Sequence, residues 1–121
     1  MDRFTLSTMA YQIAGRGLPL SPCLATLELA TGGLVPDITI LLMTSVEAGR
    51  ARQARMQKAA DRIEAEDLAF HRRVNNGYRD FARLLPNWNI RTIETDDLSV
   101  DEVYRLAIAH IATVWQPVSR F

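Results

Sequence analysis

An α/β fold built on a parallel sheet is the fold class that the sequence predicts, and three observations predict it. Helical and strand-like segments follow one another along the 121 residues in the order helix, helix, strand, helices, strand, helix. The run at residues 38–43 is short, mostly apolar and preceded by Pro36-Asp37, which is typical of a strand buried on both faces of a parallel sheet. Residues 90–95 give the only other clear strand, and two strands alone are marginal. We therefore expect a sheet that is missing strands.

Two helices are predicted before the first strand. The first covers residues 6 to about 15, where a Gly-Arg-Gly turn ends it. The second has Ser21 as its N-cap and Pro22 at its first helical position. It runs to Gly32-Gly33, a pair that can adopt the left-handed backbone of a helix end.

Three further helices are predicted around the second strand. Ser45 can cap a helix that directly follows the first strand. A longer helix covers residues 61–85, because apolar side chains recur there at helical spacing on one stripe. That stripe consists of Phe70, Val74, Tyr78, Phe81 and Leu85. Ser99 and Glu102 form a capping box for a last helix over residues 100 to about 114.

Composition indicates a single small globular domain. Hydrophobic residues make up 48% of the chain and charged residues 23%, so it is not a disordered segment. Fourteen basic residues balance fourteen acidic ones, so no overall field attracts nucleic acid or an anionic membrane. Cys23 is the only cysteine, which excludes an internal disulfide. Neither a secretory leader nor a membrane-spanning run is recognisable, and we expect a cytoplasmic protein.

The first candidate site lies at the N-terminus. Asp2-Arg3-Phe4 is followed by a helix with polar side chains and then by the glycine turn. An Asp-Arg pair in front of such a helix could anchor a phosphate and seat a base. The same residues also suit an ordinary amphipathic helix with a surface ion pair, and from the residues alone both interpretations stay open.

Several blocks together resemble the thymidylate kinases. That family carries an Asp-Arg-aromatic motif, a Ser-x-x-Ala-Tyr-Gln helix and a Gly-Arg-Gly turn, which match residues 2–4, 7–12 and 15–17. Its Ala-Thr-Gly-Gly-Leu-x-Pro-Asp-Leu-Thr pattern matches residues 30–39, with isoleucine at the ninth position. Its lid pattern Asp-Arg-Ile-Glu matches residues 61–64, and Phe-His-x-Arg-Val matches residues 70–74. The blocks occur in family order from Asp2 to about Ile111.

The resemblance implies an incomplete P-loop nucleoside-monophosphate-kinase fold, with helices on both faces of a parallel sheet. The implied reaction is transfer of a phosphoryl group from ATP, bound with Mg²⁺, to dTMP. Within one partial domain, residues 2–44 would form the dTMP-binding side and core strand, 45–66 the lid region, and 67–114 the C-terminal helices and last strand. Residues 115–121 would be a tail. The implied partners are dTMP and ATP, without nucleic acid or membrane, and intact members of the family are usually homodimers.

The resemblance also assigns roles by position. Arg3 would contact the dTMP phosphate, and Asp2 would orient that arginine and help to organise the Mg²⁺ site. The implied substrate-binding residues are Ser7, Thr8, Tyr11, Gln12, Asp61 and Glu64. Among them, the positions of Thr8, Tyr11 and Gln12 face the thymine or the deoxyribose in the family.

Basic residues in the lid region are candidates for the positive charge that phosphoryl transfer needs. The resemblance implies catalytic roles for Arg55 and Arg62, with Arg52 and Lys58 as further lid residues. The Asp-Arg-Ile-Glu match fixes the register of Arg62, whereas the preceding stretch varies in length across the family. For each of these side chains a solvated basic helix face is the alternative interpretation.

Two family elements do not occur in these 121 residues: the Gly-x-x-x-x-Gly-Lys-Ser/Thr loop that cradles ATP phosphates, and an Arg-Glu-Pro segment. We therefore expect dTMP kinase activity to require an N-terminal half, on the same polypeptide or on a complementing chain. The alternative is a non-catalytic remnant or interaction module with at most weak nucleotide binding. We also expect the isolated chain to be inactive, and to be unstable or to self-associate through residues 38–43.

Overall fold

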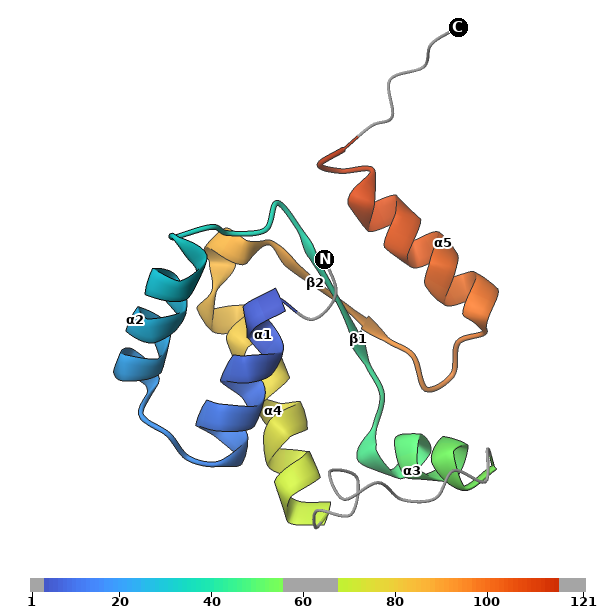
Figure 1. Ribbon diagram of the computed structural model, residues 1–121. Helices are drawn as coiled ribbons and strands as arrows, with labels where there is room; N and C mark the ends of the chain where they lie inside the picture. The colour runs from blue at the N-terminus through green and yellow to red at the C-terminus, as the bar shows by residue number, and fades with distance from the viewer. Residues whose placement is uncertain (1–3, 56–67, 116–121) are drawn as a thin grey trace, which may run out of the picture.

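The computed structural model describes residues 4–55 and 68–115, and its elements follow the predicted order (Figure 1). The chain forms α1 (Phe4–Met9), η1 (Ala10–Gly15), α2 (Leu20–Thr31), β1 (Thr39–Met43), α3 (Val46–Arg55), α4 (Leu68–Leu84), η2 (Pro86–Trp88), β2 (Ile90–Glu94) and α5 (Val100–Ile111). In Figure 1, α1, α2 and α4 gather on one side of the strands, and α5 lies on the other side. The result is a mostly helical α/β fold.

The two strands form a parallel sheet, as predicted. Leu41 and Met43 of β1 are buried against α1 and α4. Because side chains alternate along a strand, Leu42 points to the opposite face, together with its ladder partner Ile93. Ile93 is only 3% exposed, but Leu42 is 53% exposed. The prediction that this strand is buried on both faces is therefore wrong for the described residues, because they leave Leu42 exposed and Ile40 only half-buried on the second face.

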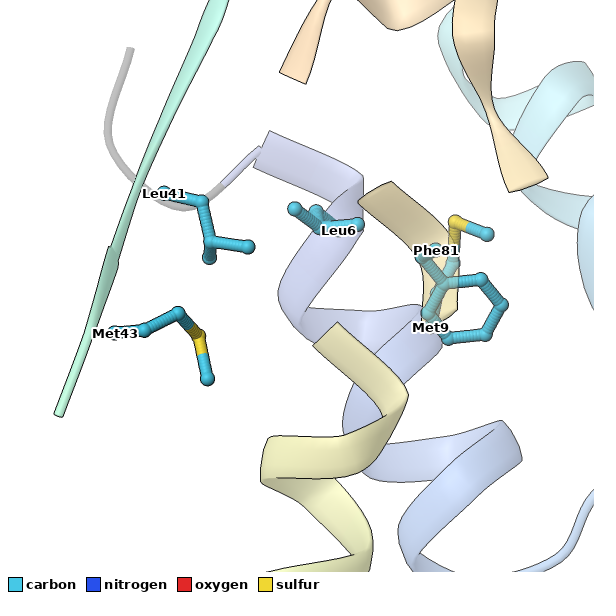
Figure 2. Close-up of a cluster of buried hydrophobic side chains, with 5 residues drawn as sticks. All are labelled: Leu6, Met9, Leu41, Met43 and Phe81. Atoms are coloured by element: carbon cyan, nitrogen blue, oxygen red, sulfur yellow. The ribbon is translucent and has the colours of Figure 1, made fainter. Parts of the chain in front are cut away.

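The core lies between the sheet and the helices α1 and α4. Figure 2 shows Leu41 and Met43 pointing from β1 toward Leu6 and Met9 of α1, with Phe81 of α4 beside Met9. Burying a large apolar side chain of this kind contributes about 1.5–3 kcal/mol. A second, smaller cluster lies at the N-terminal part of α4 and consists of Ala10, Phe70 and Val74.

The predicted stripe of the long helix is confirmed. Phe70, Val74 and Phe81 are buried, and Tyr78 and Leu85 pack partly buried against the same clusters. The helix is described from Leu68 to Leu84, so its predicted start at residue 61 lies outside the described residues. Pro86 follows the helix and begins the short turn η2, as expected for a residue that cannot continue an α-helix.

Helix caps agree with the sequence at two of three positions. Ser45 Oγ accepts a hydrogen bond from the Ala48 N–H at 3.1 Å and so caps α3. The capping box of α5 is complete, and the backbone N–H of Ser99 lowers the pKa of Glu102 by bonding its carboxylate. Ser21 is not an N-cap, because α2 already begins at Leu20 after an extended Pro19.

The helix ends show one further correction. The left-handed Gly32, with φ of 64°, ends α2 as predicted. The last helix stops at Ile111, and residues 112–114 form turns in place of the helical residues that we predicted. Of the helices in the described part of the chain, none combines the length and apolar character that crossing a membrane requires.

Candidate functional site

The helix that carries the predicted substrate-binding residues changes its winding halfway. After Met9, the α-helix α1 continues as the π-helical segment η1, which contains Tyr11 and Gln12. π-Helical turns are rare, and those that occur are frequently found at functional sites. At its end the Arg16 N–H donates to the Tyr11 carbonyl at 3.0 Å, an i→i+5 bond.

Close contact with α4 accompanies this change of winding. Gly15 is buried, and a Cβ atom at that position would lie 2.9 Å from Phe70 Cε2. Opposite, a Cβ atom on Gly77 of α4 would lie 2.3 Å from the Cβ of Ala14. Each helix thus offers a glycine where the other approaches, and the two can pack closely only because those side chains are absent.

One face of this helix carries three of the predicted residues. Tyr11 and Gln12 follow Thr8 by three and four positions, which places both side chains near Thr8 on the helix surface. Thr8 is exposed, while Tyr11 and Gln12 are half-buried. The fourth predicted residue, Ser7, places its Oγ 2.7 Å from Tyr78 Oη on α4, so its hydroxyl is engaged within the protein. The described structure therefore brings the four residues to neighbouring positions, where Thr8 is exposed, Tyr11 and Gln12 are half-buried and Ser7 is engaged with Tyr78.

An aromatic and cationic group lies beside this face. The ring centroids of Tyr11 and Phe70 are 6.0 Å apart, and the guanidinium carbons of Arg16 and Arg73 lie 5.2 Å and 5.7 Å from the Phe70 centroid. Arg73 Nε also donates to the Gly15 carbonyl at 3.2 Å, which ties α4 to the end of η1. Neither arginine was among the predicted site residues, although Arg16 lies in the Gly-Arg-Gly motif and Arg73 in Phe-His-x-Arg-Val.

A second polar cluster lies where both strands end. Thr44 Oγ1 and Thr95 Oγ1 are 2.7 Å apart, and Asn75 Nδ2 on α4 donates to the Thr44 carbonyl at 3.0 Å. The Ser45 N–H donates to Asp96 Oδ1 at 2.9 Å, and this bond lowers the pKa of the Asp96 carboxyl. In open α/β sheets, ligands bind beyond the carboxyl ends of the strands, so this edge is a second candidate site. The signal in the sequence for this cluster is a polar pair directly after each strand, Thr44-Ser45 and Thr95-Asp96.

The two predicted lid residues that the structure describes, Arg52 and Arg55, differ in their contacts with this edge. Arg52 is half-buried, and its Nη2 donates to the Thr95 carbonyl at 3.2 Å, so it belongs to the polar cluster. Arg55 is exposed, and its Nε donates to the Ala51 carbonyl of its own helix at 3.4 Å. Six predicted site residues lie outside the described residues: Asp2, Arg3, Lys58, Asp61, Arg62 and Glu64.

Two exposed ion pairs tie α4 to its neighbours. Arg72 Nη2 lies 2.7 Å from Glu47 Oε1 on α3, and Nη1 and Nη2 of Arg79 both donate to the Glu94 carboxylate on β2. The hydrogen bond from Arg72 lowers the pKa of Glu47, and that from Arg79 lowers the pKa of Glu94. These side chains are at least 45% exposed, so each pair adds little to stability at neutral pH.

Acid is expected to destabilise the protein through these carboxylates. Because Glu47, Glu94 and Asp96 have a lower pKa in the folded chain, their contribution is fully present above the unfolded-state pKa values of about 4 and is lost as the pH falls through the folded-state values. Thermal melts between about pH 7 and about pH 3 should show Tm falling on the acid side. Because both pairs are exposed, the double variant Glu47→Gln/Glu94→Gln should show only a slightly shallower fall, and a steeper fall would contradict this account.

The fold places the chain among the parallel α/β proteins, a class in which ligands generally bind beyond the carboxyl ends of the strands. The profile of the thymidylate kinase family matches residues 1–105. This chain belongs to the thymidylate kinase family.

Three relatives illustrate the likeness. The thymidylate kinase of Nostoc sp. (strain PCC 7120) is 42% identical over 113 residues, which are 93% of this chain and 52% of that relative. That of Synechococcus sp. (strain WH7803) is 51% identical over 81 residues, or 67% of this chain and 37% of the relative. That of Thermomicrobium roseum is 44% identical over 90 residues, or 74% and 43%. The chain spans about half the length of these relatives and matches roughly their C-terminal half.

Members of the family use ATP with Mg²⁺. In the ranges 4–55 and 68–115, no group of three or more His, Cys, Asp or Glu side chains is placed to hold a metal ion. Asp2, to which the resemblance gives an indirect role toward Mg²⁺, lies outside those ranges, so that assignment stays a prediction.

Proposed function

We propose that this chain forms the dTMP-binding side of a thymidylate kinase and takes part in transferring the γ-phosphoryl group of ATP to dTMP, which gives dTDP. Such an enzyme supplies dTTP biosynthesis and would work in the cytoplasm as a homodimer. The observation that carries the proposal is the placing of Thr8, Tyr11 and Gln12 near one another on one helix, with Thr8 exposed and Tyr11 beside Phe70, in a chain that belongs to this family. A phosphate-binding segment would have to join this chain for turnover.

The polar face suits recognition of a base. The Thr8 hydroxyl and the Gln12 amide can each donate and accept hydrogen bonds at the edge of thymine. A ligand without matching groups would leave them unpaired, and such loss of pairing is what gives a hydrogen-bonding site its selectivity. Tyr11 is held at the Phe70 ring and would border the deoxyribose. The contact with Phe70 supports the proposal, because it would hold the Tyr11 ring beside the substrate.

Positive charge is the second requirement of the proposed reaction. Phosphoryl transfer is catalysed mainly by positioning and by electrostatic stabilisation of charge on the migrating group. In this proposal Arg3 binds the dTMP phosphate and Asp2 orients it, while Arg55, Arg62 and the other basic residues of the lid region surround the migrating phosphoryl group. Mg²⁺ enters as the ATP complex and is part of the substrate.

A fusion protein tests the proposal. The N-terminal half of the Nostoc sp. kinase, joined to this chain, should form ADP in a manner that depends on both dTMP and ATP. Arg3→Ala should lower kcat/KM at least about 100-fold, as expected for a group that stabilises charge in the transition state. Gln12→Ala should raise KM for dTMP about tenfold or more, because it removes hydrogen bonds to the base. The control Arg105→Ala, on the exposed side of α5, should leave both constants unchanged.

One result of the fusion experiment would refute the proposal. A fusion that folds cooperatively and shows no turnover would end the catalytic proposal. The chain would then be a non-catalytic module, and titration calorimetry with dTMP would show whether the face of Thr8, Tyr11 and Gln12 still binds the nucleotide.

A further inference from the structure

We propose that Tyr78 is a positioning residue of the proposed dTMP site: its hydroxyl holds Ser7 and thereby sets the direction in which Thr8 and Gln12 face the base. The inference rests on the proposed function. It gives Ser7 a different role from the one that the resemblance implies, because Ser7 would act through its bond to Tyr78 and not by touching the substrate.

Tyr78 differs from the rest of its helical stripe by one polar atom. Its ring packs partly buried against both hydrophobic clusters, as a phenylalanine ring could. The Tyr78 hydroxyl lies 2.7 Å from Ser7 Oγ on α1, and this partly buried bond joins residues 71 positions apart. Burial therefore accounts for the ring, whereas the hydroxyl has a specific partner on the helix of the candidate site. The other members of the stripe are apolar, namely Phe70, Val74, Phe81 and Leu85.

Small residues line part of the contact between η1 and α4. Gly77 approaches Ala14 so closely that an added Cβ would lie 2.3 Å from the Ala14 Cβ. Apolar contact is non-directional, and small side chains form only low ridges against rotation of a helix about its axis. A hydrogen bond depends on direction as well as on distance. The Ser7–Tyr78 bond can therefore fix a rotation of the helix that the packing of small residues leaves free.

Each residue that would contact the base directly follows a residue that is held against α4. Ser7 is bonded to α4, and Tyr11, four positions later, contacts Phe70 with 6.0 Å between the ring centroids. Residues four positions apart share one side of a helix, which here is the side toward α4. Thr8 and Gln12 each come one position later and so lie next to that side. Rotation of the helix would move both side chains together, so the bond at Ser7 sets where both of them point.

Steady-state kinetics of the fusion enzyme tests this role. Tyr78→Phe removes the hydroxyl and keeps the ring, so the fold should survive. KM for dTMP should rise about three- to tenfold, which corresponds to the usual net contribution of one hydrogen bond, while kcat changes less than about twofold. A merely structural role would lower Tm and the active fraction, and thus kcat, without moving KM. The control Tyr104→Phe removes a hydroxyl at an exposed position on α5 and should leave both constants unchanged.

A double-mutant cycle tests whether Ser7 acts through Tyr78. Ser7→Ala removes the partner hydroxyl, so Ser7→Ala, Tyr78→Phe and the double variant should all show the same raised KM. Additive increases in the double variant would show that Ser7 binds dTMP itself, and they would overturn the inference. An unchanged KM for Tyr78→Phe in an active fusion would also overturn it, and would leave the proposed function intact.

Failure of the proposed function gives a different result. A fusion without turnover that still binds dTMP in titration calorimetry would end the kinase assignment, and the Kd values of the same variants would then test the positioning role. A folded fusion that neither turns over nor binds dTMP would end both proposals.

Discussion

Phe70→Ala is expected to lower the free energy of unfolding by about 3–5 kcal/mol. Phe70 is 5% exposed and forms a buried cluster with Ala10 and Val74. Removing its ring leaves a cavity where α4 meets η1 and withdraws the aromatic contact of Tyr11. Because that contact fixes one wall of the proposed base pocket, the substitution in the fusion enzyme should also raise KM for dTMP.

Urea denaturation followed by circular dichroism measures the effect. Phe70→Leu keeps most of the buried volume and should cost clearly less than the alanine variant. Leu29→Ala, on the exposed side of α2, should be nearly neutral. A loss below about 1 kcal/mol for Phe70→Ala would show that this cluster does not hold the two helices together.

Gly77→Ala is expected to destabilise the protein by about 1–3 kcal/mol, although alanine is the better helix former. The new Cβ would lie 2.3 Å from the Cβ of Ala14, far inside van der Waals contact, and neither methyl group can rotate away. α4 and η1 would have to separate, which would displace Tyr11 and Gln12.

A double-mutant cycle isolates this contact. Ala14→Gly removes the opposing methyl group, so Ala14→Gly/Gly77→Ala should recover much of the stability that Gly77→Ala loses. Gly49→Ala on α3 is the matched control, because its Cβ would meet only Thr44 Cγ2 at 3.9 Å. That control should be neutral or slightly stabilising. Equal losses for Gly77→Ala with and without Ala14→Gly would refute the steric account.

Much of this fold could be predicted because it depends on interactions between residues that are close together in the sequence. The stripe of α4 and the capping box of α5 depend on residues within one or two turns of each other, so their pattern is complete in the sequence. The start of α2 was misplaced because Ser21 and Pro22 fit a helix start by type, whereas the extended backbone of Pro19 sets the actual boundary. Residue type alone does not fix where the chain enters a helix.

Some features of the candidate site could likewise be predicted from the sequence, and others could not. Thr8, Tyr11 and Gln12 could be placed on one face because they share a helix. The π-helical winding beneath them could not, since it accompanies the approach of Gly77, more than sixty positions further along the chain. The strand-end cluster was also missed, because Thr44 and Thr95 are 51 positions apart and meet only when the sheet forms. The exposure of Leu42 depends on what covers β1, and its own residue type says nothing about that.

The pairing of β1 with β2 has a consequence for synthesis of the chain. Thr39 pairs with Ile90, so 51 residues must follow the start of β1 before its only described neighbour exists. At about 5–20 residues per second, the edge of β1 that pairs with β2 waits roughly 3–10 s for that partner. Contacts between such distant segments also form slowly. During that interval the unpaired edge of this apolar strand is open to aggregation.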